Sequence, residues 1–134
     1  MINKVKRACL IPLLLLATVF TACRISDADK DEFKDYFYYR VSAIAEYDEM
    51  IETGGEIHPN DWFYFLENCS YLETLTGYKL NYIVAEPPFY KSVSQMSIDT
   101  ANLSKWYVSN KDKWSMKKAD MYVYKKRRGH TVYF

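Results

Sequence analysis

The chain contains few side chains that combine into a recognisable catalytic or metal site. It has three cysteines and two histidines among its 134 residues. Cys69 could act as a nucleophile with His58 or His130 as its base, because a thiol needs a nearby proton acceptor to become a thiolate. Cys69 also falls on the apolar face of a helical pattern, where a cysteine is ordinarily a small core residue. We therefore expect Cys69 to be buried and to have no chemical role.

The remaining polar residues do not indicate metal binding or acid–base catalysis. His58 and His130 have no ligand partners at the spacing of a zinc site. Glu46 and Glu49 lie on a solvated helix face, where runs of charge are usual. The serines stand outside any G-x-S-x-G pattern, and no glycine-rich phosphate loop is present. We expect no metal, no cofactor and no enzymatic activity.

Cys23 is the cysteine to which the sequence gives a chemical role. Lys4, Lys6 and Arg7 precede an apolar run of 13 residues, 8–20. A helix that crosses a ~30 Å hydrocarbon core needs about 20 apolar residues, so this run is short for a permanent span. A basic start, a short apolar run and small residues before Cys23 are typical of a secretory signal.

The segment Phe20-Thr21-Ala22-Cys23 resembles the lipobox of bacterial lipoproteins, in which Leu usually takes the place of Phe20. The resemblance implies cleavage after Ala22 and attachment of lipid, palmitate included, to Cys23. One acyl chain holds a membrane only marginally, whereas the several chains of such lipoproteins give a stable anchor. The alternatives are an ordinary signal peptide with a coincidental cysteine, or a buried apolar helix.

This interpretation divides the chain into three parts. Residues 1–22 are a lipoprotein signal peptide, residues 23–28 are a lipidated tether, and residues 29–134 form a single small globular domain. The protein is expected in the cell envelope, lipid-anchored to a bacterial membrane, with the outer membrane favoured. The acids that follow Cys23 resemble export signals to the cell surface, with a plain solvated linker as the alternative.

The charges are unevenly distributed along the chain. Residues 24–56 hold ten acids and four bases, net −6, whereas residues 110–134 hold two acids and eight bases, net +6. The basic end favours an acidic protein or an anionic glycan as partner. Nucleic acid is not expected in the envelope.

Two amphipathic helices are predicted in the first half of the domain. Phe33, Phe37 and Val41 open an apolar stripe of period 3.6, which predicts a helix over 29–53 that starts at an Asp29 cap and ends at glycines. A second helix is predicted over 60–76, with Asn60 as its cap.

The second half predicts mixed structure. A third helix is expected over 99–114, starting near Asp99. Alternating apolar residues predict a short strand over 80–84, and residues 89–96 are expected to form a loop. Residues 121–134 resemble two short strands around a turn, so a C-terminal β-hairpin is predicted. The fold class is therefore α+β and mainly helical.

The tip of the predicted hairpin is a candidate binding surface. Four consecutive bases, Lys125, Lys126, Arg127 and Arg128, follow two tyrosines, Tyr122 and Tyr124. Exposed turns need no such residues for packing, and arginine with tyrosine is typical of protein contacts. A merely solubilising role is the alternative.

A second resemblance involves residues with structural roles. Leu75-Thr76-Gly77, and later Trp106-Tyr107-x-x-Asn110-Lys111, are similar to a pattern in small uncharacterised bacterial envelope proteins. The pattern has no catalytic residue, so it implies no activity. Trp62, Gly77, Trp106, Tyr107 and Asn110 are interpreted as structural, with an aromatic ligand groove as the alternative.

These observations favour a membrane-anchored, non-enzymatic lipoprotein that acts as a protein-binding module. The most specific version of this hypothesis is a toxin-neutralising immunity protein. A structural accessory subunit of an envelope complex and a glycan-binding lipoprotein are the alternatives.

Overall fold

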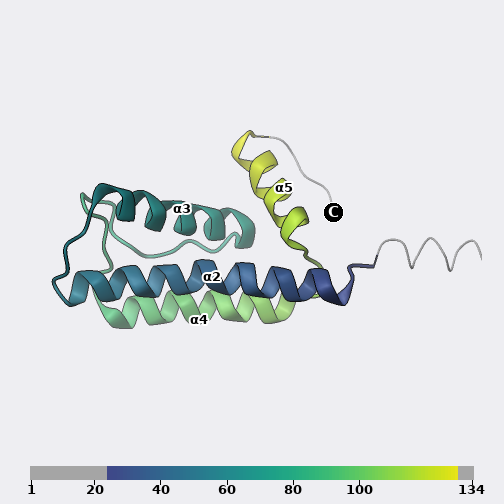
Figure 1. Cartoon of the computed structure of the whole chain (residues 1–134), viewed down its shortest axis with the longest axis horizontal. Helices are drawn as coiled ribbons and strands as arrows, with labels where there is room; N and C mark the ends of the chain where they lie inside the picture. Colours follow the sequence, from purple (N-terminus) through teal and green to yellow (C-terminus); the bar gives the residue numbers. More distant parts are fainter. Residues whose placement is uncertain (1–23, 130–134) are drawn as a thin grey trace, which may run out of the picture.

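The computed structural model of the chain describes residues 24–129. Four helices follow one another: α2, Asp27–Glu52; α3, Pro59–Thr76; α4, Val93–Asn110; and α5, Met116–Arg127. The long α2 is the centre of the molecule, with α3 and α4 lying along it, as Figure 1 shows. The shorter α5 rises steeply from the end of α2 where the described chain begins. The predicted signal peptide, Cys23 and His130 lie outside the described residues.

The apolar stripe of α2 forms the floor of the core. Phe33, Phe37 and Ile44 are almost completely buried. The helix starts two residues before the predicted Asp29, because the side chain of Ser26 accepts a 3.2 Å hydrogen bond from the backbone of Asp29 and so caps the first turn. It ends at Thr53, and Gly54 then adopts a positive φ of 68°.

The helix predicted over 60–76 corresponds to α3. Its N-cap is His58 rather than Asn60, and the side chain of Asp61 accepts a 3.0 Å hydrogen bond from the backbone of His58. Gly77 ends the helix as predicted, in the left-handed conformation at φ 71° that favours glycine. The expected starts were therefore displaced by one turn at most, because neighbouring polar residues competed for the cap.

The third helix begins much earlier than the sequence predicts. Its cap is Ser92, whose side chain accepts a 3.1 Å hydrogen bond from Gln95, so the expected loop over 89–96 is half helix. Asp99 was predicted as the cap, but it lies inside α4 and is fully buried. The helix ends at Asn110, and Trp114 is buried in the turn that follows.

The strand predicted over 80–84 is absent from the described chain, as is any other strand. Ile83 and Phe89 exchange two backbone hydrogen bonds, at 2.7 and 3.2 Å, which form one isolated antiparallel bridge. Side chains, rather than a neighbouring strand, accept the backbone hydrogen bonds of part of this loop. Glu73 accepts one from the N–H of Leu80 at 3.3 Å, and Asp99 accepts one from the N–H of Asn81 at 2.6 Å. The prediction of an α+β fold is wrong, and the described chain is mainly helical.

The predicted C-terminal hairpin is also wrong, because residues 116–127 form α5. The side chain of Ser115 caps this helix by accepting a 3.1 Å hydrogen bond from Lys118. Ala119 and Val123 are spaced by one turn and are both buried, which is helical rather than strand periodicity. The remaining predicted hairpin residues, 130–134, lie outside the described chain.

Aromatic rings fill much of the core. Phe37 stacks on Trp106 with ring centroids 5.6 Å apart, and Tyr47 stacks on Phe65 at 4.2 Å. Tyr107 is buried against Phe37 at 5.3 Å. These contacts between α2 and the two flanking helices set the positions of their outer faces.

No helix in the described part of the chain is long and apolar enough to cross a membrane.

Candidate binding site between α2, α3 and α5

A pocket of about 590 Å³ lies where α3 and α5 meet over α2. Its size is within the ~300–1,000 Å³ range of ordinary ligand pockets. We call it the corner pocket. Its lining residues are Arg40, Glu67, Tyr71, Asp120, Val123, Tyr124, Arg127 and Arg128.

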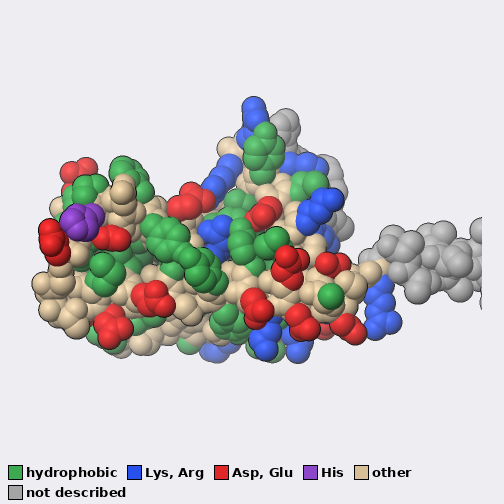
Figure 2. Space-filling model, viewed as in Figure 1, with side chains coloured by type: hydrophobic (Ala, Val, Ile, Leu, Met, Phe, Trp, Pro, Cys, Tyr) green, Lys and Arg blue, Asp and Glu red, His purple; other side chains and the backbone are tan. Residues whose placement is uncertain are grey.

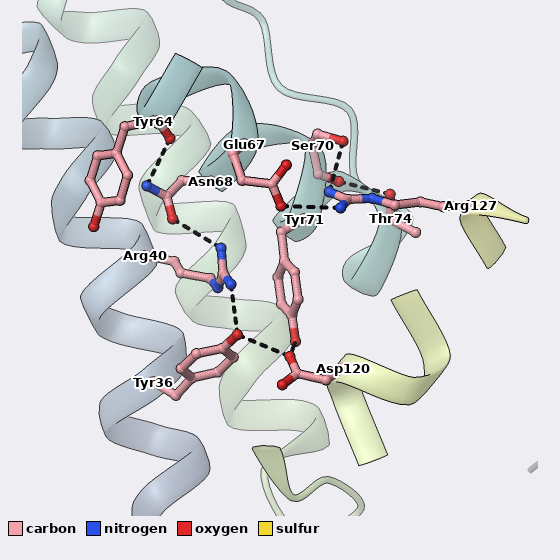
Figure 3. A network of polar contacts seen from close by, with 10 residues as sticks. All are labelled: Tyr36, Arg40, Tyr64, Glu67, Asn68, Ser70, Tyr71, Thr74, Asp120 and Arg127. Carbon is pink, nitrogen blue, oxygen red and sulfur yellow. Dashed lines mark hydrogen bonds and ion pairs between the residues drawn. The ribbon is translucent and has the colours of Figure 1, made fainter. Parts of the chain in front are cut away.

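Arg40, from the middle of α2, lies at the base of the corner pocket. Its guanidinium is 3.8 Å from the centroid of the Tyr71 ring and 4.7 Å from that of Tyr36. It donates to Oδ1 of Asn68 at 3.1 Å and to the hydroxyl of Tyr36 at 2.6 Å (Figure 3). These partners are all formally neutral, and among the described residues Arg40 forms no ion pair with a carboxylate. Its positive charge therefore remains uncompensated by direct contact.

Asp120 joins three helices in this network. Its Oδ1 accepts hydrogen bonds from Tyr71 of α3 at 2.6 Å and from Tyr36 of α2 at 2.9 Å. Figure 3 shows the chain that runs from Arg40 through Tyr36 to Asp120. Burial, and then the hydrogen bond to Asp120, raise the pKa of Tyr71, so its hydroxyl remains a donor. The network therefore holds α5 against the other two helices.

Arg127 and Arg128 form the outer wall of the pocket. Arg127 donates to Glu67 and to Ser70 of α3, both at 3.1 Å. Arg128 donates to the hydroxyl of Tyr124, and its guanidinium lies 5.3 Å from the Tyr124 ring. Arg127 therefore fastens the end of α5 to α3, whereas Arg128 keeps its charge at the mouth of the pocket.

The structure divides the predicted binding residues into two groups. Tyr124, Arg127 and Arg128 line the corner pocket. Lys125 and Lys126 are exposed on α5 but do not line it. Tyr122 is half-buried and packs edge-on against Trp114 with centroids 5.3 Å apart, while Lys126 lies 5.7 Å from the Tyr122 ring. The interpretation of the four bases as a hairpin turn is corrected: Lys125, Lys126 and Arg127 form the last turn of α5, and Arg128 is its C-cap.

The sequence did not indicate a binding role for Arg40, Tyr71 or Asp120. A signal was available for Arg40, because it interrupts an apolar helix stripe that otherwise reads Phe37, Val41, Ile44. A charged residue beside such a stripe needs aromatic or polar partners from another element. Asp120 offered no comparable signal, because its role depends on the helix that the sequence did not predict.

Two of the residues interpreted as structural, Trp62 and Trp106, pack against the core. Trp106 is half-buried in the aromatic core, and Asn110 donates a 2.8 Å hydrogen bond to the backbone oxygen of Trp106. Trp62 is half-buried against the core, and its Nε1 has no hydrogen-bond partner among the described residues.

Cys69 is fully buried in the core, as predicted. Burial raises the pKa of its thiol, with the charges of Glu73 and Asp99 adding to the effect, so the thiolate is strongly disfavoured. His58 is exposed at the N-terminus of α3. No group of three or more metal-ligating side chains occurs within residues 24–129.

Asp99 is a second polar centre, remote from the corner pocket. It is fully buried, and its carboxylate accepts hydrogen bonds from Tyr78 at 3.0 Å, Tyr90 at 2.8 Å and both nitrogens of Asn81 at 2.6 and 2.8 Å. Such complete pairing explains how an acid can be buried. It holds the loop 77–92 on α4 and leaves little capacity for a ligand.

In comparisons with known proteins, the chain matches no family model, no curated protein and no solved structure.

Proposed function

We propose that the chain is an envelope lipoprotein, anchored through lipid on Cys23, whose helical domain binds a protein partner without catalysing a reaction. The corner pocket supports this proposal best. It combines Arg40, Arg127 and Arg128 with Tyr71 and Tyr124, the residue types that dominate the energy of protein interfaces.

The chemistry of the pocket favours an acidic partner. Its lining holds three arginines against two carboxylates, and both carboxylates already have partners within the chain. Arg128 contacts a tyrosine rather than an acid, so its guanidinium can bind a carboxylate in a two-pronged contact. Lys125 and Lys126 add positive charge beside the pocket, which would accelerate association with an acidic surface.

The rigidity of the site is a further argument for binding. Tyr36, Tyr71 and Asp120 fasten α5 to α2 and α3 through hydrogen bonds of 2.6–2.9 Å. A surface that is already ordered loses less conformational entropy when a partner binds.

The test is photo-crosslinking of the full chain in its own cells. A photoreactive phenylalanine analogue at position 124 should capture a protein whose cross-linked segment is rich in Asp and Glu. The matched control places the same analogue at Val108, which is 64% exposed on α4 against 58% for Tyr124. Capture of the same products at both positions, or a captured segment without acids, would contradict the proposal.

A further inference from the structure

The charge of the surface differs between α5 and the turn that joins α2 to α3. No Lys or Arg occurs between Arg40 and Lys79, whereas residues 116–128 hold six bases and one acid. Figure 2 shows Lys and Arg gathered on α5, whereas Asp and Glu lie around the turn between α2 and α3 and also along the start of α2. The acids of the stretch without bases are Glu46, Asp48, Glu49, Glu52, Glu56, Asp61, Glu67 and Glu73.

Two pockets lie along the groove between α2 and α3. The corner pocket is its basic end, and a smaller pocket of about 170 Å³ is its acidic end. Beneath the surface, Arg40 bonds to buried Asn68, and Asn68 donates at 3.0 Å to the backbone oxygen of Tyr64, so residues of the two pockets are linked. We call this surface the seam. The acidic pocket is lined by Ala43, Glu46, Tyr47, Met50, Asp61 and Tyr64.

Two exposed tyrosines occupy the middle of the seam. Tyr39 of α2 is 63% exposed and Tyr64 of α3 is 47% exposed. The hydroxyl of Tyr64 donates to that of Tyr39, so the two rings hold each other in place. Fixed aromatic rings with a polar edge are typical of the centre of a protein interface.

We propose that the seam binds a second copy of the chain, antiparallel, about a two-fold axis near Ala43. A two-fold axis presents the same surface to itself with its ends exchanged, so a basic end always meets an acidic one. Arg40 and Glu46 lie on opposite sides of Ala43, each about 4.5 Å along α2 at ~1.5 Å per residue. After the two-fold rotation, Arg40 of each copy therefore lies opposite Glu46 of the other.

The position of α5 suits this arrangement. It rises away from α2 at the basic end, as Figure 1 shows, rather than lying along the other helices. In the antiparallel pair, Arg128 at the end of α5 therefore faces the acidic pocket of the second copy, where Glu46 is exposed. The pair would also cover the corner pocket, so a second copy and an acidic partner compete for it.

The first test is cross-linking of the full chain in membranes with a bis-maleimide reagent, which joins two thiols over a longer distance than a disulfide does. Tyr39→Cys lies near the proposed axis, and Val108→Cys, with nearly the same exposure (63% against 64%), lies on the outer face of α4. At ~1.5 Å per residue, Tyr39 lies about 6 Å from Ala43 along α2, so its two copies are about 12 Å apart in the pair. This distance exceeds the ~7 Å limit of a disulfide but is within reach of the reagent, so only the Tyr39→Cys chain should form a covalent dimer. Equal cross-linking of both variants and the parent would overturn the proposal.

The second test exchanges charges across the pair and measures dimer dissociation of the full chain in detergent by sedimentation. Arg128→Glu and Glu46→Lys should each weaken the dimer about tenfold or more, whereas the double variant, which restores opposite charges, should return close to the parent. Lys105→Glu on α4 is the control for a reversed base and should have no effect. A parent that remains monomeric at about 1 mM, or a double variant weaker than both single variants, would overturn the proposal.

These results are separate from those for the proposed function. A second copy would be recognised among the cross-linked products at position 124 by its mass. A monomeric chain that still captures an acidic protein would refute the dimer and keep the proposed function.

Discussion

The hydroxyl of Tyr71 donates a 2.6 Å hydrogen bond to Oδ1 of Asp120, which joins α3 to α5 across 49 residues of sequence. The acceptor is a carboxylate, and such bonds are stronger than those between neutral groups. Because Asp120 also accepts from Tyr36, a single side chain positions α5 against two other helices. The geometry of the corner pocket therefore depends on this residue.

Tyr71→Phe should reduce the free energy of unfolding by about 1.5–3 kcal/mol, because it removes a hydrogen bond that a buried tyrosine donates to a charged carboxylate. Tyr124→Phe is the control, since its hydroxyl contacts exposed Arg128 and its loss should cost less than about 0.5 kcal/mol. Urea unfolding of both variants measures the difference. Equal stability of the two variants would show that the Asp120 contact does not hold α5.

The sequence predicted α2 and α3 well because one apolar stripe and a glycine stop defined each helix. It failed for α5 because Met121-Tyr122-Val123-Tyr124 alternates as a strand does, and the alternation hid the pair Ala119 and Val123 one helical turn apart. The serine cap and the basic last turn, which suits the helix dipole, were the stronger signals.

Asp99 was interpreted as a helix cap because Ile98 and Leu103 stand at the spacing of a hydrophobic staple around it. Its role as a buried acceptor could not be predicted, since its donors come from residues 78, 81 and 90 and only the folded loop brings them together. The corner pocket was partly predicted, through Tyr124, Arg127 and Arg128. Arg40 and Tyr71, at the base of the pocket, could not be predicted, because only the packing of α2 on α3 brings them together.

Asp99→Ala should destabilise the fold by about 3 kcal/mol or more, because it leaves one buried and several partly buried donors without an acceptor. Tyr90→Phe removes one of these donors and should cost about 1 kcal/mol, since Asp99 keeps its other partners. Thermal and urea unfolding measure both values. A cost for Asp99→Ala no larger than that for Tyr90→Phe would contradict the structural role of this carboxylate.

Asp48 should make stability depend on pH. It is 2% exposed, its Oδ1 has no hydrogen-bond partner among the described residues, and burial followed by the charge of Glu52 raises its pKa. A raised pKa means that the folded state binds the proton more tightly, so this group's contribution falls as pH rises from ~4 through the raised pKa.

Asp48→Asn should therefore stabilise the fold at pH 7 relative to the parent, and the gain should vanish below about pH 4, where the carboxylate is protonated in both states. Asp35→Asn, which changes an exposed acid of the same helix, is the control and should show little difference at either pH. Unfolding in urea across this range gives the two curves. A gain that persists unchanged at low pH would exclude titration of Asp48 as its cause.

Lipidation of Cys23 is tested by Cys23→Ala. The variant should not take up palmitate label, and it should remain unprocessed or leave the membrane, because the acyl acceptor is lost. Cys69→Ser is the control, since Cys69 is fully buried in the core. Undiminished labelling of Cys23→Ala would refute the anchor.

The last prediction separates the two groups of bases on α5. Arg128 lines the corner pocket and Lys125 does not, although both are exposed and lie within one turn. Arg128→Glu should weaken binding of the captured acidic partner about tenfold or more, and salt should weaken the parent's binding, whereas Lys125→Glu should change affinity by about twofold or less. Arg127→Glu is unsuitable as a binding test, because it also breaks the contacts with Glu67 and Ser70 that fasten α5. The measurement is the dissociation constant at low and raised ionic strength. If Arg128→Glu and Lys125→Glu weakened the affinity for the partner equally, overall charge rather than the pocket would determine the binding.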